Sequence, residues 1–81
     1  MKDILDGIVD KYREMWLRYV DLLKENPGNE LVDYKRKLYF AKYQIAEYAG
    51  IEYEKGTEID LNDLARRLDG VHVELPTWAT K

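Results

Sequence analysis

The fold is decided by a stretch that reads Tyr34-Lys35-Arg36-Lys37-Leu38-Tyr39-Phe40-Ala41-Lys42-Tyr43. It carries four cations, four aromatic rings and no anion. In a helix, successive residues turn by about 100°. Tyr34 then shares an apolar stripe with the leucines around it, whereas Tyr39 and Tyr43 point elsewhere, with Phe40 at the edge of their group. A helix with two apolar faces needs a separate partner for each face.

Upstream of this stretch, apolar residues recur at alternating three- and four-residue steps. This period predicts a helix over residues 2–25. Its main stripe consists of Leu5, Ile8, Tyr12, Met15, Tyr19 and Leu22, and a second stripe of Val9, Trp16, Val20 and Leu23 runs beside it. The two stripes together cover a wider arc than a helix with one neighbour buries.

A strong turn signal, Asn26-Pro27-Gly28-Asn29, follows the first helix. Proline disfavours helical geometry at Asn26, and Gly28 tolerates turn conformations. Asn29 is a good N-cap, so we expect a second helix over residues 30–49, with Gly50 as its C-cap. A connection this short predicts that the two helices form an antiparallel hairpin.

Residues 51–81 show a different periodicity. Two short alternating runs flank Lys55-Gly56, which suggests a small β-hairpin over residues 51–59. A short helix is expected over residues 61–68, capped by Asp60 or Asn62. Residues 71–75 alternate like a strand that ends at Pro76. We therefore expect one domain over residues 1–81, in which residues 51–81 form a covering segment of a short helix and short β-like segments.

The predicted fold is thus mainly α, built on a long antiparallel helical hairpin. At 81 residues the chain is near the size at which a single core supplies little net stability. It contains no cysteine, so disulfides do not add to it. Because the hairpin carries more apolar surface than its two helices bury between them, we expect a homodimer in which two hairpins form a four-helix bundle.

The residue types argue against catalysis. The chain has no serine and no cysteine, which removes the commonest nucleophiles, and it has a single histidine, His72. Its glycines stand singly and form no phosphate-binding loop. We expect no enzyme activity, no metal and no cofactor. No apolar run is long enough to span a membrane and no signal peptide is recognisable, so we expect a cytoplasmic protein.

Charge is segmented along the chain, and this bears on function. Residues 34–46 sum to +4, whereas residues 47–63 sum to −5. Such segregation favours self-association or a charged partner. We expect a small non-enzymatic interaction or regulatory module that binds another protein. The candidate partner-binding residues are Lys35, Arg36, Tyr39, Phe40, Lys42, Tyr43 and Trp78.

Two questions remain open for these residues. Tyr39 and Tyr43, one helical turn apart among cations, could stack on unpaired bases, so nucleic-acid binding is the alternative function. The competing interpretation, which we favour, makes the rings core that is covered by residues 51–81 or by a second subunit. Trp78 either docks back on the domain, which we also favour, or is offered to a partner.

Overall fold

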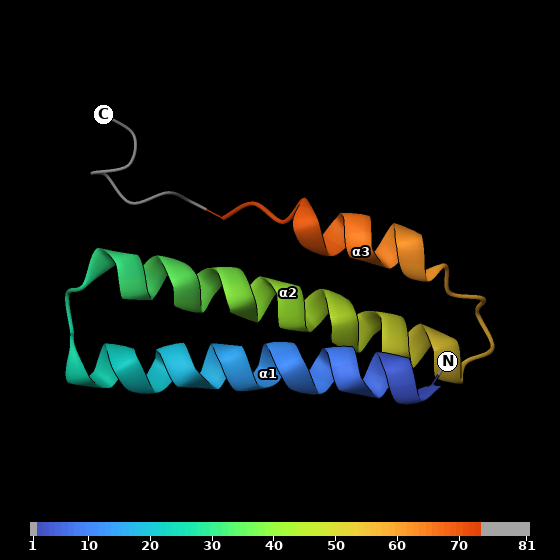
Figure 1. The fold of residues 1–81 in the computed structure, drawn as a ribbon, viewed down its shortest axis with the longest axis horizontal. Coiled ribbons are helices and arrows are strands. Elements are labelled where there is room, and N and C mark those ends of the chain that lie inside the picture. The colour runs from blue at the N-terminus through green and yellow to red at the C-terminus, as the bar shows by residue number, and fades with distance from the viewer. Residues whose placement is uncertain (1, 74–81) are drawn as a thin grey trace.

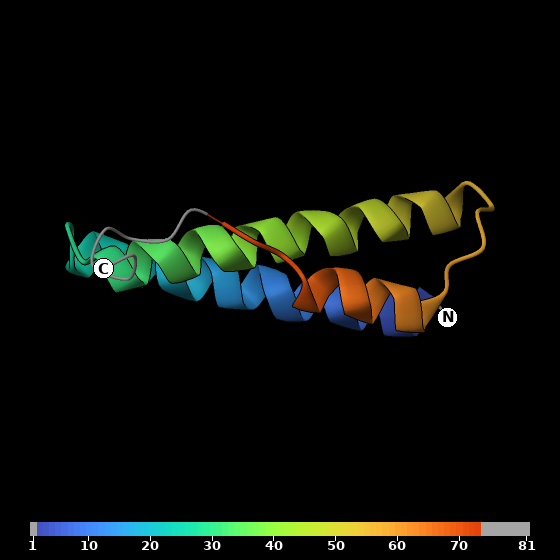
Figure 2. The ribbon, with the colours of Figure 1, turned by 90° about the horizontal axis from the view of Figure 1, so that it is seen from above.

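The computed structural model describes residues 2–73, which form three helices and no strand (Figure 1). These are α1 (Lys2–Glu25), α2 (Glu30–Glu54) and α3 (Leu61–Asp69). The two long helices run antiparallel, side by side, and α3 packs along the C-terminal half of α2 (Figures 1 and 2). The predicted helical hairpin and the mainly helical fold class are confirmed.

The turn between α1 and α2 follows the chemistry of its residues. The backbone N–H groups of Leu31 and Val32 each donate to Oδ1 of Asn29 at 3.1 Å, so Asn29 is the N-cap of α2. Gly28 has a φ of 95°, in the left-handed region that favours glycine. The turn thus reverses the chain within a few residues and sets α2 against α1.

The predicted end of the second helix is wrong, since α2 continues through Gly50 to Glu54. Gly50 lies inside the helix, and the left-handed glycine that follows the helix is Gly56, with a φ of 95°. A glycine inside a helix costs about 1 kcal/mol relative to alanine. Tyr53, one turn beyond Gly50, packs against the core, and this contact offsets that cost.

The short β-like segments are not found in the described chain. Residues 51–54 are the last turn of α2, so the expected hairpin over residues 51–59 is wrong. Residues 71–73 have no regular structure, and residues 74 and 75 lie outside the described range. A strand needs a neighbour to bond its backbone groups, and the part of the chain that the structure describes offers none.

Helix α3 agrees with its predicted position within one residue. Oδ1 of Asp60 accepts the backbone N–H groups of Asn62 at 2.9 Å and of Asp63 at 3.4 Å, so Asp60 is the N-cap. Leu64 and Leu68, one turn apart, are its buried residues. They direct α3 onto the hairpin and cover one face of α2.

The core lies at the open end of the hairpin. Leu5 of α1, Ala49 of α2 and the two leucines of α3 are buried together there. Partly buried residues packed around them are Ile8, Tyr12, Ile45, Tyr53, Ile59 and Leu61. None of residues 6–45 is fully buried, so the half of the hairpin near the turn has a thinner core.

Replacement of Leu5 tests this arrangement. Leu5 is 2% exposed, and we expect Leu5→Ala to lower the free energy of unfolding by about 2–5 kcal/mol. The matched control is Leu17→Ala on the same helix, where the side chain is 42% exposed and the loss is expected to stay below about 1 kcal/mol. Urea denaturation followed by circular dichroism measures both. Equal losses would contradict a core centred on Leu5.

Candidate protein-binding surface

The rings singled out in the sequence form an aromatic seam between α1 and α2. Tyr39 lies between two rings of α1, with centroid distances of 6.4 Å to Tyr12 and 5.4 Å to Tyr19. Trp16 contacts Phe40 at 4.8 Å and Tyr43 at 5.6 Å. We name these six residues the aromatic seam.

The element that covers Tyr39 and Tyr43 differs from the one expected from the sequence. Residues 51–81 or a second subunit were expected to cover Tyr39 and Tyr43, but α1 covers them. The other stripe of α2, which includes Ala41 and Ile45, instead faces the groove beside α3. The helical period separates two stripes on a helix, but it does not say which of them meets which neighbour.

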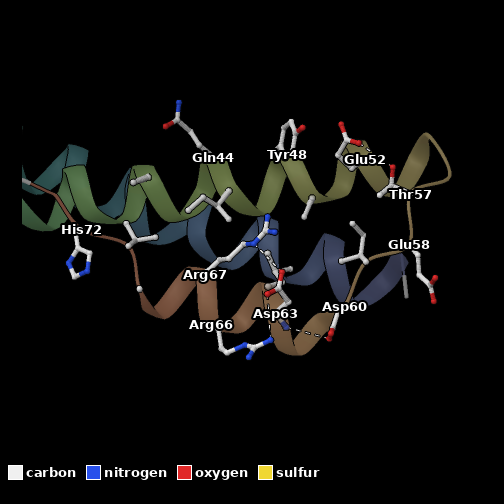
Figure 3. A pocket seen from close by; sticks show the side chains of 17 residues that line it. Gln44, Tyr48, Glu52, Thr57, Glu58, Asp60, Asp63, Arg66, Arg67 and His72 are labelled. Carbon is white, nitrogen blue, oxygen red and sulfur yellow. Dashed lines mark hydrogen bonds and ion pairs between the residues drawn. The ribbon is translucent and has the colours of Figure 1, made fainter.

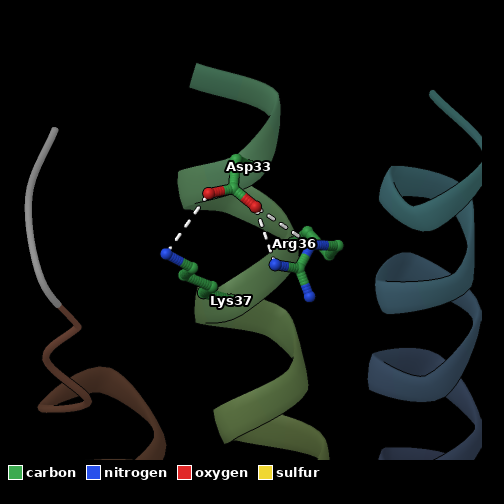
Figure 4. A network of polar contacts seen from close by, with 3 residues as sticks. All are labelled: Asp33, Arg36 and Lys37. Carbon is green, nitrogen blue, oxygen red and sulfur yellow. Dashed lines mark hydrogen bonds and ion pairs between the residues drawn. The ribbon is translucent and has the colours of Figure 1, made fainter. Parts of the chain in front are cut away.

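The cations of this stretch are also engaged. Asp33 lies one turn before Arg36 and Lys37 and pairs with both (Figure 4). Nη2 of Arg36 donates to Oδ1 of Asp33 at 2.7 Å, and Nζ of Lys37 lies 3.2 Å from Oδ2. Nζ of Lys42 lies 5.9 Å from the ring centroids of both Tyr12 and Tyr39. These contacts leave little of the predicted basic face free.

The remaining candidates are Lys35 and Trp78. Lys35 is half-buried and makes no ion pair within residues 2–73. Trp78 lies outside the described residues, and so do both interpretations of its role. Of the candidates, Tyr39, Phe40, Lys42 and Tyr43 contact rings of α1, and Arg36 pairs with Asp33 within α2.

An open groove lies between α2 and α3 (Figure 3). Its volume is about 1040 Å³. Its apolar wall contains Ala41, Ile45, Ala49, Ile59, Leu64 and Val71. Its polar side chains are those of Gln44, Glu52, Thr57, Glu58, Asp60, Asp63, Arg66, Arg67 and His72, and Tyr48 adds a ring on α2. The groove is thus apolar inside, with a charged and aromatic rim.

Local contacts fix the charges on the rim. Asp63 holds both arginines of α3, with its Oδ2 3.1 Å from Nε of Arg67 and its Oδ1 3.5 Å from Nη2 of Arg66. On the α2 side, the Thr57 hydroxyl donates to Oε2 of Glu52 at 3.2 Å. The α3 rim is therefore net positive in its second half, while the 52–60 end is acidic.

A second surface lies on the outer side of α2, away from α3 and beside the edge of the aromatic seam that Phe40 and Tyr43 form. A shallow depression there is lined by Phe40, Tyr43, Gln44, Glu47, Tyr48 and Ile51. Tyr48 is 61% exposed and Ile51 is 46% exposed, so large apolar groups meet solvent on this side. Interaction with the Glu47 carboxylate, helped by burial, raises the pKa of Tyr43.

Sequence reasoning missed both of these exposed residues. Tyr48 is not among the candidate residues, and the prediction that the second helix ends at Gly50 places Ile51 in a β-hairpin. A helix continued through Gly50 would have placed Ile51 eleven residues after Phe40, close to the same face. The spacing therefore places Ile51 on this face only when the helix is known to continue past Gly50.

Within residues 2–73, no group of three or more His, Asp or Glu side chains is arranged to hold a metal ion. The described part of the chain also has no buried polar or charged residue. Of its helices, none is both long and apolar enough to cross a membrane. The expectations of no catalysis and no cofactor stay predictions.

Comparison with protein-family models, with characterised proteins and with solved structures found no match to this chain. The geometry of the two open surfaces is therefore the basis for assigning a function.

The aromatic seam predicts a contrast between two tyrosines of α2. We expect Tyr39→Ala to lower the free energy of unfolding by roughly 2–4 kcal/mol, because the ring packs between two others. Tyr48→Ala is the matched control, and its 61% exposed ring predicts a change below about 1 kcal/mol. Thermal melts at low protein concentration would compare the two. A larger loss for Tyr48→Ala would refute the seam.

Asp33 predicts a specific acid dependence of stability. Its hydrogen bonds from Arg36, together with the charge of Lys37, lower the pKa of Asp33 in the folded chain. The folded state therefore binds the proton less readily, so this stabilisation is complete above the unfolded pKa of about 3.9 and is lost as the pH falls below it. Because these groups are partly exposed, the effect is at most about 1 kcal/mol.

The measurement is urea unfolding of the parent chain and Asp33→Asn between pH 7 and pH 2. We expect the parent chain to be the more stable at pH 7, with the difference narrowing below pH of about 4. A difference that stays constant over this range would show that the pairs with Arg36 and Lys37 do not stabilise the fold.

Proposed function

We propose that this chain is a small non-enzymatic interaction module, of a regulatory kind, that binds another protein through the groove between α2 and α3. The observation that carries the proposal is the open apolar wall of the groove beside a charged and aromatic rim. Apolar grooves between helices are a common way to recognise a segment of another protein.

The open shape of the groove favours a protein segment over a small molecule. Pockets for small ligands usually enclose most of the ligand. This groove, with a volume of about 1040 Å³, instead runs open along the length of α3 (Figure 3). Side chains of a bound segment would meet Ile45, Ile59 and Val71, which are half-buried in its absence.

The charges of the rim favour one orientation of that segment. Glu52, Glu58 and Asp60 lie at the end where α2 gives way to α3, and Arg66 and Arg67 lie further along α3. A segment with basic residues at one end and acidic residues at the other would match both parts of the rim. Such complementarity adds mainly to specificity and association rate.

Nucleic-acid binding stays the alternative prediction, but no observation favours it. Tyr39 and Tyr43 already stack on rings of α1. Asp33 pairs with two of the four cations, which weakens the basic face that phosphates would need. Titration of the chain with single- and double-stranded oligonucleotides at low salt would detect such binding.

A homodimer is a further part of the proposal. Ile51 and Tyr48 remain exposed on the outer side of α2, and a second hairpin packed there would complete the four-helix bundle expected from the sequence. A cytoplasmic location also belongs to the proposal. Its support is compositional, since the chain carries no cysteine to form disulfides.

Selection from a displayed peptide library tests the groove. We expect the chain to enrich peptides that combine apolar residues with clustered charge. Binding of these peptides is expected to weaken at least about tenfold in the double variant Arg66→Glu/Arg67→Glu.

The matched control is Arg13→Glu/Arg18→Glu, which reverses two exposed arginines of α1 and should leave peptide binding unchanged. Enriched peptides that bind equally well to both double variants would place the binding surface outside the groove. Failure to enrich any peptide would count against the proposed function.

A further inference from the structure

A regular row of residues follows the outer face of α2. Its members alternate steps of three and four residues and are Lys37, Phe40, Gln44, Glu47, Ile51 and Glu54. We name this row the outer strip. Phe40 is half-buried beside Trp16, and the other five residues are exposed. Steps of three and four are the spacing with which one helix packs along another.

The strip has a heptad assignment. Lys37, Gln44 and Ile51 take the a positions, seven residues apart, and the other three residues take the d positions. In a parallel pair of identical helices, each residue of such a seam meets its own copy. Lysine would then face lysine and each glutamate would face its own copy, so the charges oppose a parallel pair.

In an antiparallel pair, unlike charges face each other and like charges do not. Each a residue then lies opposite a d residue of the second copy. With Gln44 set opposite Glu47, Lys37 comes opposite Glu54 and Phe40 comes opposite Ile51. Each contact occurs twice by symmetry. All six layers of the strip therefore join unlike charges, an amide with a carboxylate, or two apolar side chains.

A shift of the register by one heptad loses this match. Sliding the second copy so that Lys37 meets Glu47 leaves Phe40 against Gln44 and sets Ile51 against Asp33. The same shift brings Glu30 close to Glu54, two like charges. The sequence of the strip thus favours the first register over this shifted one.

We propose that a second copy of this chain packs on the outer strip, with the two α2 helices antiparallel and Lys37 of each copy paired with Glu54 of the other. This inference rests on the dimer of the proposed function and adds its register. The two-fold axis is perpendicular to the plane of the antiparallel pair. Both α1 helices therefore lie on one face of the pair, and both α3 helices lie on the other face. The four long helices then form a bundle, and each groove beside α3 borders the interface at Gln44 and Tyr48.

Lys37 and Glu54 already make ion pairs within one chain, but these do not prevent the proposed pair between two copies. Nζ of Lys37 lies 3.2 Å from Asp33, and Oε1 of Glu54 lies 3.3 Å from Nζ of Lys2. Both pairs are at the surface, where an ion pair contributes little. Lys37 and Glu54 can therefore leave these partners at little cost and pair across the interface.

Charge reversal across the strip tests the register. Dimer dissociation is measured by sedimentation equilibrium at low salt for the parent chain, Lys37→Glu, Glu54→Lys and the double variant. Each single variant creates two like-charge contacts, and we expect it to raise the dissociation constant about tenfold or more. The double variant restores both pairs, so we expect it to recover most of the parent affinity.

Two matched controls accompany the series. Lys24→Glu reverses an exposed charge of α1 outside the strip and should leave dissociation unchanged. Ile51→Ser should abolish dimerisation, whereas Leu17→Ser, at a side chain with similar exposure, should not. Circular dichroism of every variant confirms that the helices are retained.

The outcomes separate the register from the dimer. Recovery in the double variant would support the proposed pair. A stable dimer whose dissociation constant is unchanged by all the charge reversals would overturn this register but not the dimer itself. A parent chain that stays monomeric at every concentration would overturn both, while the groove remains open to the peptide selection.

Discussion

The aromatic seam between α1 and α2 determines how the rest of the molecule is arranged. Tyr39 lies between Tyr12 and Tyr19, and Trp16 lies against Phe40 and Tyr43. Aromatic pairs at such distances contribute about 0.5–1.5 kcal/mol each beyond the burial of their area. The seam fixes the rotation of α2 about its axis. That rotation decides which stripe meets α3 and which residues face outward.

The position of the seam also determines which surfaces remain open for binding. The basic and aromatic stretch that attracts attention in the sequence is mostly engaged within the hairpin, through α1 and through Asp33. What remains open is the groove beside α3 and the outer face of α2. Binding of a protein segment would use the groove beside α3, and pairing of two copies would use the outer face of α2. Gln44 and Tyr48 lie on the edge that these two surfaces share.

The hairpin could be predicted because its signals are local. Alternating steps of three and four mark α1, and Asn29 supplies a strong cap for α2. The C-terminal end of α2 could not be predicted. Packing of Tyr53 against the core outweighs the low helix propensity of Gly50, and no local sequence pattern indicates that contact. The site residues share this limit. Periodicity placed Tyr39 and Tyr43 on one face, but the identity of the covering helix depends on tertiary packing.

Nuclear Overhauser contacts between aromatic rings test the seam most directly. In the chain labelled for aromatic detection, we predict contacts from the Tyr39 ring to the rings of Tyr12 and Tyr19, and from Trp16 to Phe40 and Tyr43. An isotope-filtered experiment on a mixture of labelled and unlabelled protein detects only contacts between copies. The predicted ring contacts should be absent from it, because they lie within one chain. Contacts from Tyr39 to α3, or ring contacts found only between copies, would contradict the account.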